Sequence, residues 1–435
     1  MTRSLLLKII LLAFSGLVVV AFALIGFLYI TRGTPLRAVT AFGDPAGPPS
    51  VGDPQFRRTM ELHTGVVMLE GNKVRVAING DQTYPQLWAD LRSARRSITL
   101  QMYYCKPGRM ATELKDILVD RAGAGVRVLF LLDAFGAQDL SKAYLDSLEV
   151  AGVRVSKFRP LHWYSFDKFS HRSHIRVVVV DGSVGWTGGF GIDDKWFGDG
   201  RHDDQWRDTN ARFEGPAVMQ HQATFAAGWA EATGELLTGD LFFPPSGFRP
   251  DGQVYAALLH LAPTTGSTPA ERFLALTITA ARRTLYVSNS YFVPDDDFRR
   301  LLVAAAKRGV DVRILTTSDK TDVPTTWYAG RRRYEELLRG GVRVFEYQPV
   351  MMHAKTIVAD GLWASVGTMN FDNRSLVFND ETNLVALDAA LGAELETIFL
   401  EDLRYAREID LETFRRRSAW ERVKENGAHL LSRLL

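Results

Sequence analysis

The chain has 435 residues, 46% of them hydrophobic, which is enough for two ordinary domains or for one large duplicated domain with a sizeable core. The 52 basic and 50 acidic residues nearly cancel, which argues against a nucleic-acid partner because nucleic-acid-binding domains are usually strongly basic. Cys105 is the only cysteine, so the chain can form neither an internal disulfide nor a multi-cysteine zinc site.

An uncharged apolar run of 22 residues, Ile9 to Ile30, lies near the N-terminus. At a rise of ~1.5 Å per residue, a helix of this length can cross a bilayer. The alternative is a cleaved signal peptide, but its apolar core is normally ~7–15 residues long and ends at small residues. This run is longer and ends in bulky side chains, so we expect a retained transmembrane anchor over residues 1–33.

The charges that flank the run bear on which side of the membrane the rest of the chain occupies. Three positive charges precede the run, counting the terminal amine, and two follow it closely. The excess of one slightly favours a cytoplasmic N-terminus with the catalytic body outside, and it is too small to decide the side. Glycines and prolines are frequent over residues 34–63, which we expect to be a linker.

The rest of the chain contains an internal repeat, which predicts two similar domains over residues 64–248 and 249–435. The first copy opens at residues 94–104 with ARRSITLQMYY, and the second opens at 281–291 with ARRTLYVSNSY. Each continues with the same alternation of helices and short β-branched strands, which predicts an α/β fold with a mostly parallel sheet in each half. Two such halves packed face to face would bring equivalent segments to one pseudo-twofold interface.

A histidine-centred motif closes each copy of the repeat. In both copies a basic residue follows two positions after the histidine, an aspartate follows five positions after that, and a run of small residues comes next. Residues two apart on a strand share a face, so each imidazole has a cation beside it, and this pair suits an attack on phosphorus. One such motif would mean little, but two at matching places indicate one phosphate site. The candidate catalytic residues are His174, Arg176, Asp181, His353, Lys355 and Asp360.

The two aspartates of the motif each precede a glycine, as Asp181-Gly182 and Asp360-Gly361. This pair is a turn signal, so a hairpin should return toward the small-residue run, and the aspartates are interpreted as structural. The small residues, Gly189 among them, would let backbone amides approach an anionic ligand.

The second motif closely resembles that of the phospholipase D superfamily, and within it the bacterial cardiolipin synthases. The similarity extends through Gly367, Thr368 and Asn370 to Glu381, and it covers roughly Gly71 to the C-terminus. Four further segments are similar to cardiolipin synthases: residues 206–209, 214–218, 290–295 and 372–375.

The first motif departs from the family pattern at two positions. Arg176 stands where the family has lysine, and Gly191 stands where it usually has asparagine. Arginine keeps the charge and adds a bidentate fork for phosphate oxygens. The missing amide removes one hydrogen bond, which costs ~10²–10³ in rate at worst.

The resemblance implies a two-step phosphoryl exchange through a covalent phosphohistidine. It assigns the nucleophile to His174 and the acid/base role to His353, while Arg176 and Lys355 hold the non-bridging oxygens. No metal and no cofactor is expected, because side chains supply the cations. The supporting and phosphate-binding candidates are Asn370, Thr368 and Gly189, together with Asp208 and Glu381, which would each orient an imidazole.

The function implied by the resemblance is that of a membrane-anchored phosphatidyltransferase. It would move a phosphatidyl group from one phosphatidylglycerol to another and release glycerol, at the bacterial inner membrane. One alternative is hydrolysis of phospholipid to phosphatidic acid. Another is a superfamily nuclease, which the near-neutral charge and the anchor argue against. A third, motivated by Arg176 and Gly191, is a catalytically weakened lipid-binding protein. The sequence does not indicate an oligomeric state.

Overall fold

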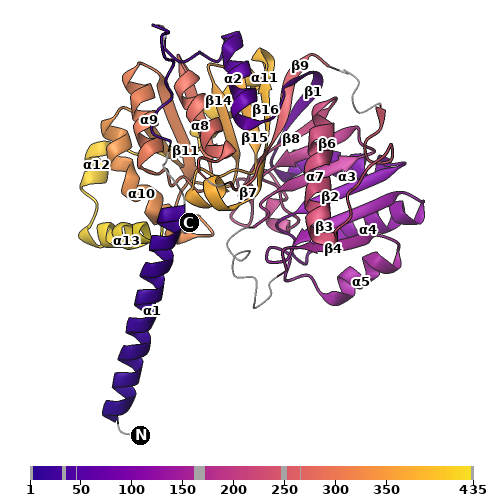
Figure 1. Ribbon diagram of the computed structural model, residues 1–435, viewed down its shortest axis with the longest axis horizontal. Helices are drawn as coiled ribbons and strands as arrows, with labels where there is room; N and C mark the ends of the chain where they lie inside the picture. Colours follow the sequence, from indigo (N-terminus) through magenta and orange to yellow (C-terminus); the bar gives the residue numbers. More distant parts are fainter. Residues whose placement is uncertain are drawn as a thin grey trace.

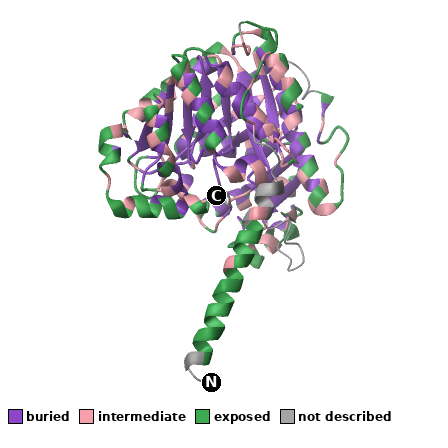
Figure 2. Cartoon of the chain, turned by 60° about the vertical axis from the view of Figure 1, so that its left-hand side comes forward, coloured by how far each residue is buried: buried purple, intermediate pink, exposed green. Residues whose placement is uncertain are grey.

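The computed structural model describes residues 3–31, 36–45, 47–160, 172–245, 252–264 and 266–432. A single helix, α1 (Arg3–Thr31), projects from a body built of two lobes (Figure 1). Between Leu5 and Leu24 the side chains of α1 are exposed almost throughout (Figure 2). Within the described part of the chain, α1 is the one helix long and apolar enough to cross a membrane, over Leu5–Leu24. Its place and composition agree with the expected anchor.

The two halves of the body have the same order of elements. The first half contains β1 (Leu69–Ile78), α3 (Asn79–Ser93), β2 (Ser97–Met102), α4 (Arg109–Gly123), β3 (Arg127–Asp133), α5 (Lys142–Val150), β4 (Arg154–Phe158), β5 (Arg176–Val180), β6 (Val184–Gly188), β7 (Trp206–Arg207), β8 (Thr209–Glu214) and α7 (Ala217–Thr233). The second half contains β9 (Val254–Leu261), α8 (Pro269–Ala280), β10 (Thr284–Asn289), α9 (Asp296–Lys307), β11 (Asp311–Thr317), α10 (Pro324–Arg339), β12 (Arg343–Tyr347), β13 (Met351–Met352), β14 (Lys355–Ala359), β15 (Trp363–Gly367), β16 (Glu381–Leu387) and α11 (Ala389–Leu403). The chain ends with β17 (Ala406–Glu408), α12 (Leu411–Arg415) and α13 (Ala419–Leu430).

Fifteen strands form one hydrogen-bonded sheet in the order β17-β12-β11-β10-β14-β15-β16-β9-β1-β8-β6-β5-β2-β3-β4. The halves join where β9 pairs with β1. Among the described strands of this sheet, only the pairings within β2-β3-β4 and within β10-β11-β12 are parallel. The short strands β7 and β13 form a separate parallel pair. The expectation of a mostly parallel sheet in each half is therefore wrong, and the sheet is mixed. Within each of these two groups a crossover helix connects each strand to its parallel neighbour, whereas the motif strands β5-β6 and β14-β15 form hairpins, which pair antiparallel.

Alternation along the motif strands shows how the two halves pack. Val177 and Val179 belong to an inner core that also contains Leu384 and Ala386 of the second half. The intervening residues of β5, Val178 and Val180, face a separate outer core beneath helices of the first half. The second half has its own outer core. The halves therefore pack face to face through the inner core, as the duplicated pattern predicts.

The two motif aspartates form the hairpin turns. Asp181 and Asp360 adopt left-handed backbone conformations (φ 53° and 55°), as do the glycines that follow them (φ 64° for both), and this combination matches the two-residue turn favoured in hairpins. The Asp181 carboxylate accepts backbone N–H groups at the start of β2, and Asp360 does the same at the start of β10. Each aspartate lies roughly 16 Å along its strand from the basic residue of its motif. We therefore assign both a structural role rather than a catalytic one.

The end of the stretch expected to be a linker is folded. Residues Pro54–Thr64 form helix α2, whose N-cap is the Asp53 side chain. This helix contacts α8 of the second half, and the ring of Phe56 packs edge-on against Trp363 with centroids 5.0 Å apart.

Candidate active site

The two motif histidines lie at the junction of the halves, and the backbone of the opposite half holds each of them. His174 directly precedes β5, and His353 lies between β13 and β14. The His174 N–H donates to the Asp380 carbonyl (3.0 Å), and the His353 N–H donates to the Arg207 carbonyl (2.7 Å). Both side chains are nearly buried, with 7% and 3% of their surface exposed. Neither half could place its histidine without the other.

The imidazoles are also paired with carboxylates crosswise. Nδ1 of His174 lies 2.9 Å from a carboxylate oxygen of Glu381, which belongs to the second half. Nδ1 of His353 lies 2.8 Å from a carboxylate oxygen of Asp208, which belongs to the first half. Because Nδ1 is engaged in each ring, Nε2 is the nitrogen left to face a substrate.

Each carboxylate is held by further donors. Glu381 accepts hydrogen bonds from the Ser375 hydroxyl (2.6 Å) and the Thr368 hydroxyl (2.5 Å). Burial raises the pKa of Glu381 to about 8, and the two hydroxyl donors oppose this shift. Burial raises the pKa of Asp208 to about 6, and the charge of Lys355 opposes it. Each carboxylate is thus fixed against Nδ1 of its imidazole.

The two basic residues occupy equivalent places in the two halves. Arg176 donates from Nη1 to the His174 carbonyl (2.8 Å), and Lys355 donates from Nζ to the His353 carbonyl (2.6 Å). Each is 1% exposed. Arginine at position 176 therefore reproduces the position of lysine in the other half, and the departure from the family pattern leaves a cation at the site.

The same repeat position supports both cations with different chemistry. Tyr103 and Ser290 correspond in the aligned repeats. The Ser290 hydroxyl accepts from Lys355 Nζ (2.7 Å), whereas the Tyr103 ring lies beneath the Arg176 guanidinium, 5.7 Å from its carbon. The Tyr103 ring also packs edge-on against His174 at 5.1 Å. The aromatic ring suits a flat guanidinium and the hydroxyl suits a compact ammonium.

The charges of Arg176 and Lys355 act on both histidines. Burial lowers the pKa of His174 well below its ordinary value, and the charges of Arg176 and Lys355 lower it further. Burial lowers the pKa of His353 in the same way, with Lys355 and Arg176 again adding to the shift. Each histidine therefore feels the cation of both halves. The rings are neutral in this state, which leaves an Nε2 lone pair for attack, and an anionic substrate would raise both pKa values.

The missing asparagine of the first motif has a structural explanation. A Cβ atom on Gly191 would lie 2.8 Å from the Trp196 ring, so that ring fills the space of the absent side chain. The Trp196 indole N–H donates to Asp208 (2.8 Å), and its ring packs edge-on against His353 at 5.2 Å. At Gly189, a Cβ would lie 2.3 Å from the Asp208 carboxylate, so only glycine allows this approach.

We expect Gly191→Asn to lower turnover strongly, because the new side chain displaces Trp196 from Asp208 and His353. Trp196→Ala should lower it less, since the hydrogen bond lost to a charged group is worth about 1.5–3 kcal/mol. The double variant opens the space that the amide needs, so it should be more active than Gly191→Asn alone. The test is a double-mutant cycle on kcat. If the effects of the two changes are additive, the indole of Trp196 does not occupy the space that an asparagine at position 191 would need.

The pH dependence of anion binding follows from Lys355. Burial lowers the pKa of Lys355 to about 7; it also lowers the pKa of Arg176, but from a much higher ordinary value, so the guanidinium stays charged. A bound phosphate needs the charged ammonium, so above pH 7 binding takes up a proton and affinity falls by up to about tenfold per pH unit. Below pH 7 this group adds no pH dependence.

The measurement is inhibition of the full-length protein by inorganic phosphate between pH 6 and 9. Lys355→Arg keeps its charge over this range and should flatten the profile. Equal slopes for wild type and Lys355→Arg would contradict the assignment.

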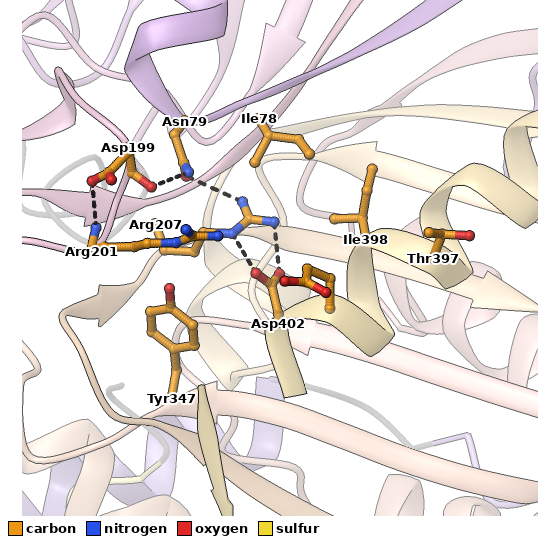
Figure 3. Close-up of a pocket in the computed structure, with 10 residues that line it drawn as sticks. Ile78, Asn79, Asp199, Arg201, Arg207, Tyr347, Thr397, Ile398 and Asp402 are labelled. Atoms are coloured by element: carbon orange, nitrogen blue, oxygen red, sulfur yellow. Dashed lines mark hydrogen bonds and ion pairs between the residues drawn. The ribbon is translucent and has the colours of Figure 1, made fainter. Parts of the chain in front are cut away.

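The residue before Asp208, Arg207, forms an ion pair across the two halves and so holds the backbone of Asp208 in place. Arg207 of β7 makes two contacts of 2.7 and 2.8 Å with Asp402 of α11 (Figure 3). Asn79, with its backbone at φ 57°, accepts the Asp208 N–H on its side-chain oxygen (3.0 Å). A cavity of about 250 Å³ lies between the halves, and its lining includes Asn79, Arg207, Asp402 and Tyr347. The position of His353 thus depends on contacts that reach well beyond the imidazole.

The structure places the remaining site candidates and adds others. Asn370 is buried, and its side-chain oxygen has no protein partner among the described residues, so this oxygen is available to accept a hydrogen bond from a ligand. Ser290 and Ser375 lie in segments that the sequence analysis matched to cardiolipin synthases without a role. Trp196 and Tyr103 were not singled out. The sequence signal for Trp196 lies five residues earlier, where Gly191 replaces the family's asparagine. The missing side chain leaves a space that another residue must fill.

Comparison with known proteins agrees with this geometry. The family model described as cardiolipin synthase, PLD-like domain, matches residues 87–229 and 274–403. A cardiolipin synthase of Geobacillus kaustophilus (strain HTA426) is 37% identical over 366 residues, which is 84% of this chain and 72% of that protein. A cardiolipin synthase 2 of Bacillus anthracis is 34% identical, with 83% of this chain and 71% of that protein covered.

Solved structures show the same fold at low sequence identity. The phosphatidylserine synthase of Haemophilus influenzae Rd KW20 superimposes with a TM-score of 0.65 at 12% identity, covering 88% of this chain and 100% of that one. A polyphosphate kinase of Porphyromonas gingivalis gives a TM-score of 0.53 at 13% identity, with 78% of this chain and 49% of that one covered. The two halves of the fold, the paired motifs and the relatives together place this chain in the cardiolipin synthase family of phospholipase D-like proteins.

Proposed function

We propose that the protein makes cardiolipin from two molecules of phosphatidylglycerol through a phosphohistidine on His174. Membership of the family makes the chain a phospholipase D-type phosphatidyltransferase that acts on phospholipid. The proposal adds the headgroup, the covalent intermediate and the residue roles. The observation that carries it is the crosswise pairing of His174 with Glu381 and of His353 with Asp208.

In the first step, Nε2 of His174 attacks the phosphorus of the donor lipid. The bond from phosphorus to the headgroup glycerol oxygen breaks, and His353 gives its Nε2 proton to that oxygen. The negative charge of the bound phosphodiester raises the pKa of His353 and so supplies the protonated form. Arg176 and Lys355 hold the non-bridging oxygens, with Asn370 as a further donor.

In the second step, a glycerol hydroxyl of another phosphatidylglycerol attacks the phosphohistidine. His353 takes the proton from that hydroxyl, the bond between phosphorus and His174 breaks, and cardiolipin leaves. Both imidazoles return to their starting protonation states. Glu381 holds the proton of His174 on Nδ1 throughout, so that Nε2 stays the reacting atom.

We further propose that α1 crosses the bacterial inner membrane as a single span. Its length, its composition and the phospholipid chemistry of the family support this placement. We propose 1–33 as the anchor and 64–248 and 249–435 as the two halves of the chain, and we end the linker that begins at residue 34 before α2 (Pro54–Thr64).

The experiment is incubation of detergent-solubilised protein with phosphatidylglycerol, with products followed by mass spectrometry. We expect cardiolipin and glycerol in equal amounts. Phosphatidic acid as the main product would instead assign hydrolysis. Absence of turnover with lipid still bound would indicate a weakened lipid-binding member. The position of Arg176, which matches that of Lys355, favours an active enzyme over that last outcome.

A further inference from the structure

Helix α13 packs on the body through a charged side chain, Glu425, and a small one, Ala428. Glu425 is fully buried at 0% exposure and pairs with Arg417 at 2.8 Å and with Arg331 at 3.6 Å. A capping box of Ser418 and Glu421 begins the helix. These contacts fix the rotation of α13 on the body, so the direction of its outer face is set.

The outer face of α13 carries an apolar stripe. Trp420, Val423 and Leu430 are exposed over 65%, 56% and 77% of their surface, and Leu431 over 45%. With Gly427, the first three follow a spacing of three, four and three residues, which lies along one side of a helix. A helix of a water-soluble surface would turn such a stripe inward, so this one needs an apolar surrounding outside the body.

The place of α13 on the body indicates that its apolar surrounding is a bilayer. α13 lies on the underside of the body in Figure 1, the side from which α1 leaves, whereas α2 lies on the opposite side. A bilayer crossed by α1 therefore faces α13. Exposed cations flank the stripe, at Arg416, Arg422 and Lys424. Tryptophan and basic side chains are the residues that settle at the headgroup level of a bilayer, and the cations favour anionic lipid.

We propose that α13 lies in the headgroup region of an anionic bilayer and forms a second membrane contact beside α1. The span α1 and the stripe on α13 would then hold the body on the lipid at two places. A second contact fixes which face of the body meets the lipid. This inference concerns the lipid surface and stands whether the transferred group goes to phosphatidylglycerol or to water.

The test uses the full chain with Val423→Cys, labelled with a polarity-sensitive fluorophore. Labelling is selective because Cys105 is the only native cysteine and is buried. His174→Asn in the same chain prevents turnover of the lipid. The matched control is Leu62→Cys on α2, which is 78% exposed and lies on the side away from α1. Both proteins are reconstituted into phosphatidylcholine vesicles with and without phosphatidylglycerol, and quenched with headgroup-level nitroxide lipid.

We expect a blue shift and strong quenching at position 423, greater with phosphatidylglycerol, and neither at position 62. A label at 423 that stays in water would overturn the proposal. A shift that instead rises with protein density and comes with crosslinking between copies would assign the stripe to a second copy of the chain, and would overturn it too.

A second variant keeps the proposal testable through activity. Trp420→Gln/Val423→Gln/Leu430→Gln changes only exposed side chains remote from the imidazoles. We expect a severalfold loss of turnover on vesicle phosphatidylglycerol, with turnover of a monomeric short-chain phosphatidylglycerol unchanged. Leu62→Gln should affect neither. An equal loss on both substrates would show that the stripe only stabilises the fold, against the proposal.

Discussion

His174→Asn is expected to abolish both cardiolipin formation and covalent labelling of the protein, because it removes the nitrogen that bonds to phosphorus. A loss of about 10⁶-fold is the scale seen when a nucleophile is removed from a catalytic unit. His353→Asn should be nearly as inactive on phosphatidylglycerol, since the glycerol oxygen then leaves without a proton. The two variants therefore look alike on the natural lipid.

A phosphodiester with a p-nitrophenol leaving group separates them. That group leaves as the anion and needs no acid, so His353→Asn should release one equivalent of p-nitrophenol and retain the phosphoryl group, trapped by denaturation at alkaline pH. His174→Asn should show no burst. A burst in His174→Asn and none in His353→Asn would exchange the two assignments.

Glu381→Gln is expected to lower turnover by about 10⁴-fold, the size of the effect when the carboxylate that orients a catalytic histidine becomes an amide. The glutamine keeps the shape but no longer holds the proton of His174 on Nδ1. Asp208→Asn should be comparably inactive on phosphatidylglycerol. Because the pairing crosses between the halves, the two variants must differ on the activated substrate.

With p-nitrophenol as the leaving group, Asp208→Asn should keep the burst, as His353→Asn does, and Glu381→Gln should lose it, as His174→Asn does. Thermal unfolding of each variant serves as the control, since the amide must not unfold the site. The reverse pattern would mean that each carboxylate acts on the histidine of its own half, contrary to the distances.

The sequence predicted the parts of this site that repeat in the chain. The two motifs and the face-to-face halves follow from the duplication, because two similar halves bring equivalent segments to one interface. The hairpin turns at Asp181-Gly182 and Asp360-Gly361 follow from local turn chemistry. Each of these features depends on residues that are close in sequence.

Features that depend on contacts between the halves could not be predicted. Nothing local in the segment around Glu381 shows that its carboxylate serves His174 rather than His353, since the choice is made by packing across the interface. Likewise, the gap left by Gly191 is filled by Trp196 only because the chain turns back after β6. The mixed sheet had local signals in its hairpins, but the alternation of helices and strands led to the opposite expectation.

The most direct test of a shared catalytic centre is a crystal structure of the full chain with vanadate. We predict one vanadium atom, bonded to Nε2 of His174, with an apical oxygen within hydrogen-bond distance of Nε2 of His353 and the equatorial oxygens on Arg176 and Lys355. Two separate anions, each on one histidine and one cation, would contradict the account.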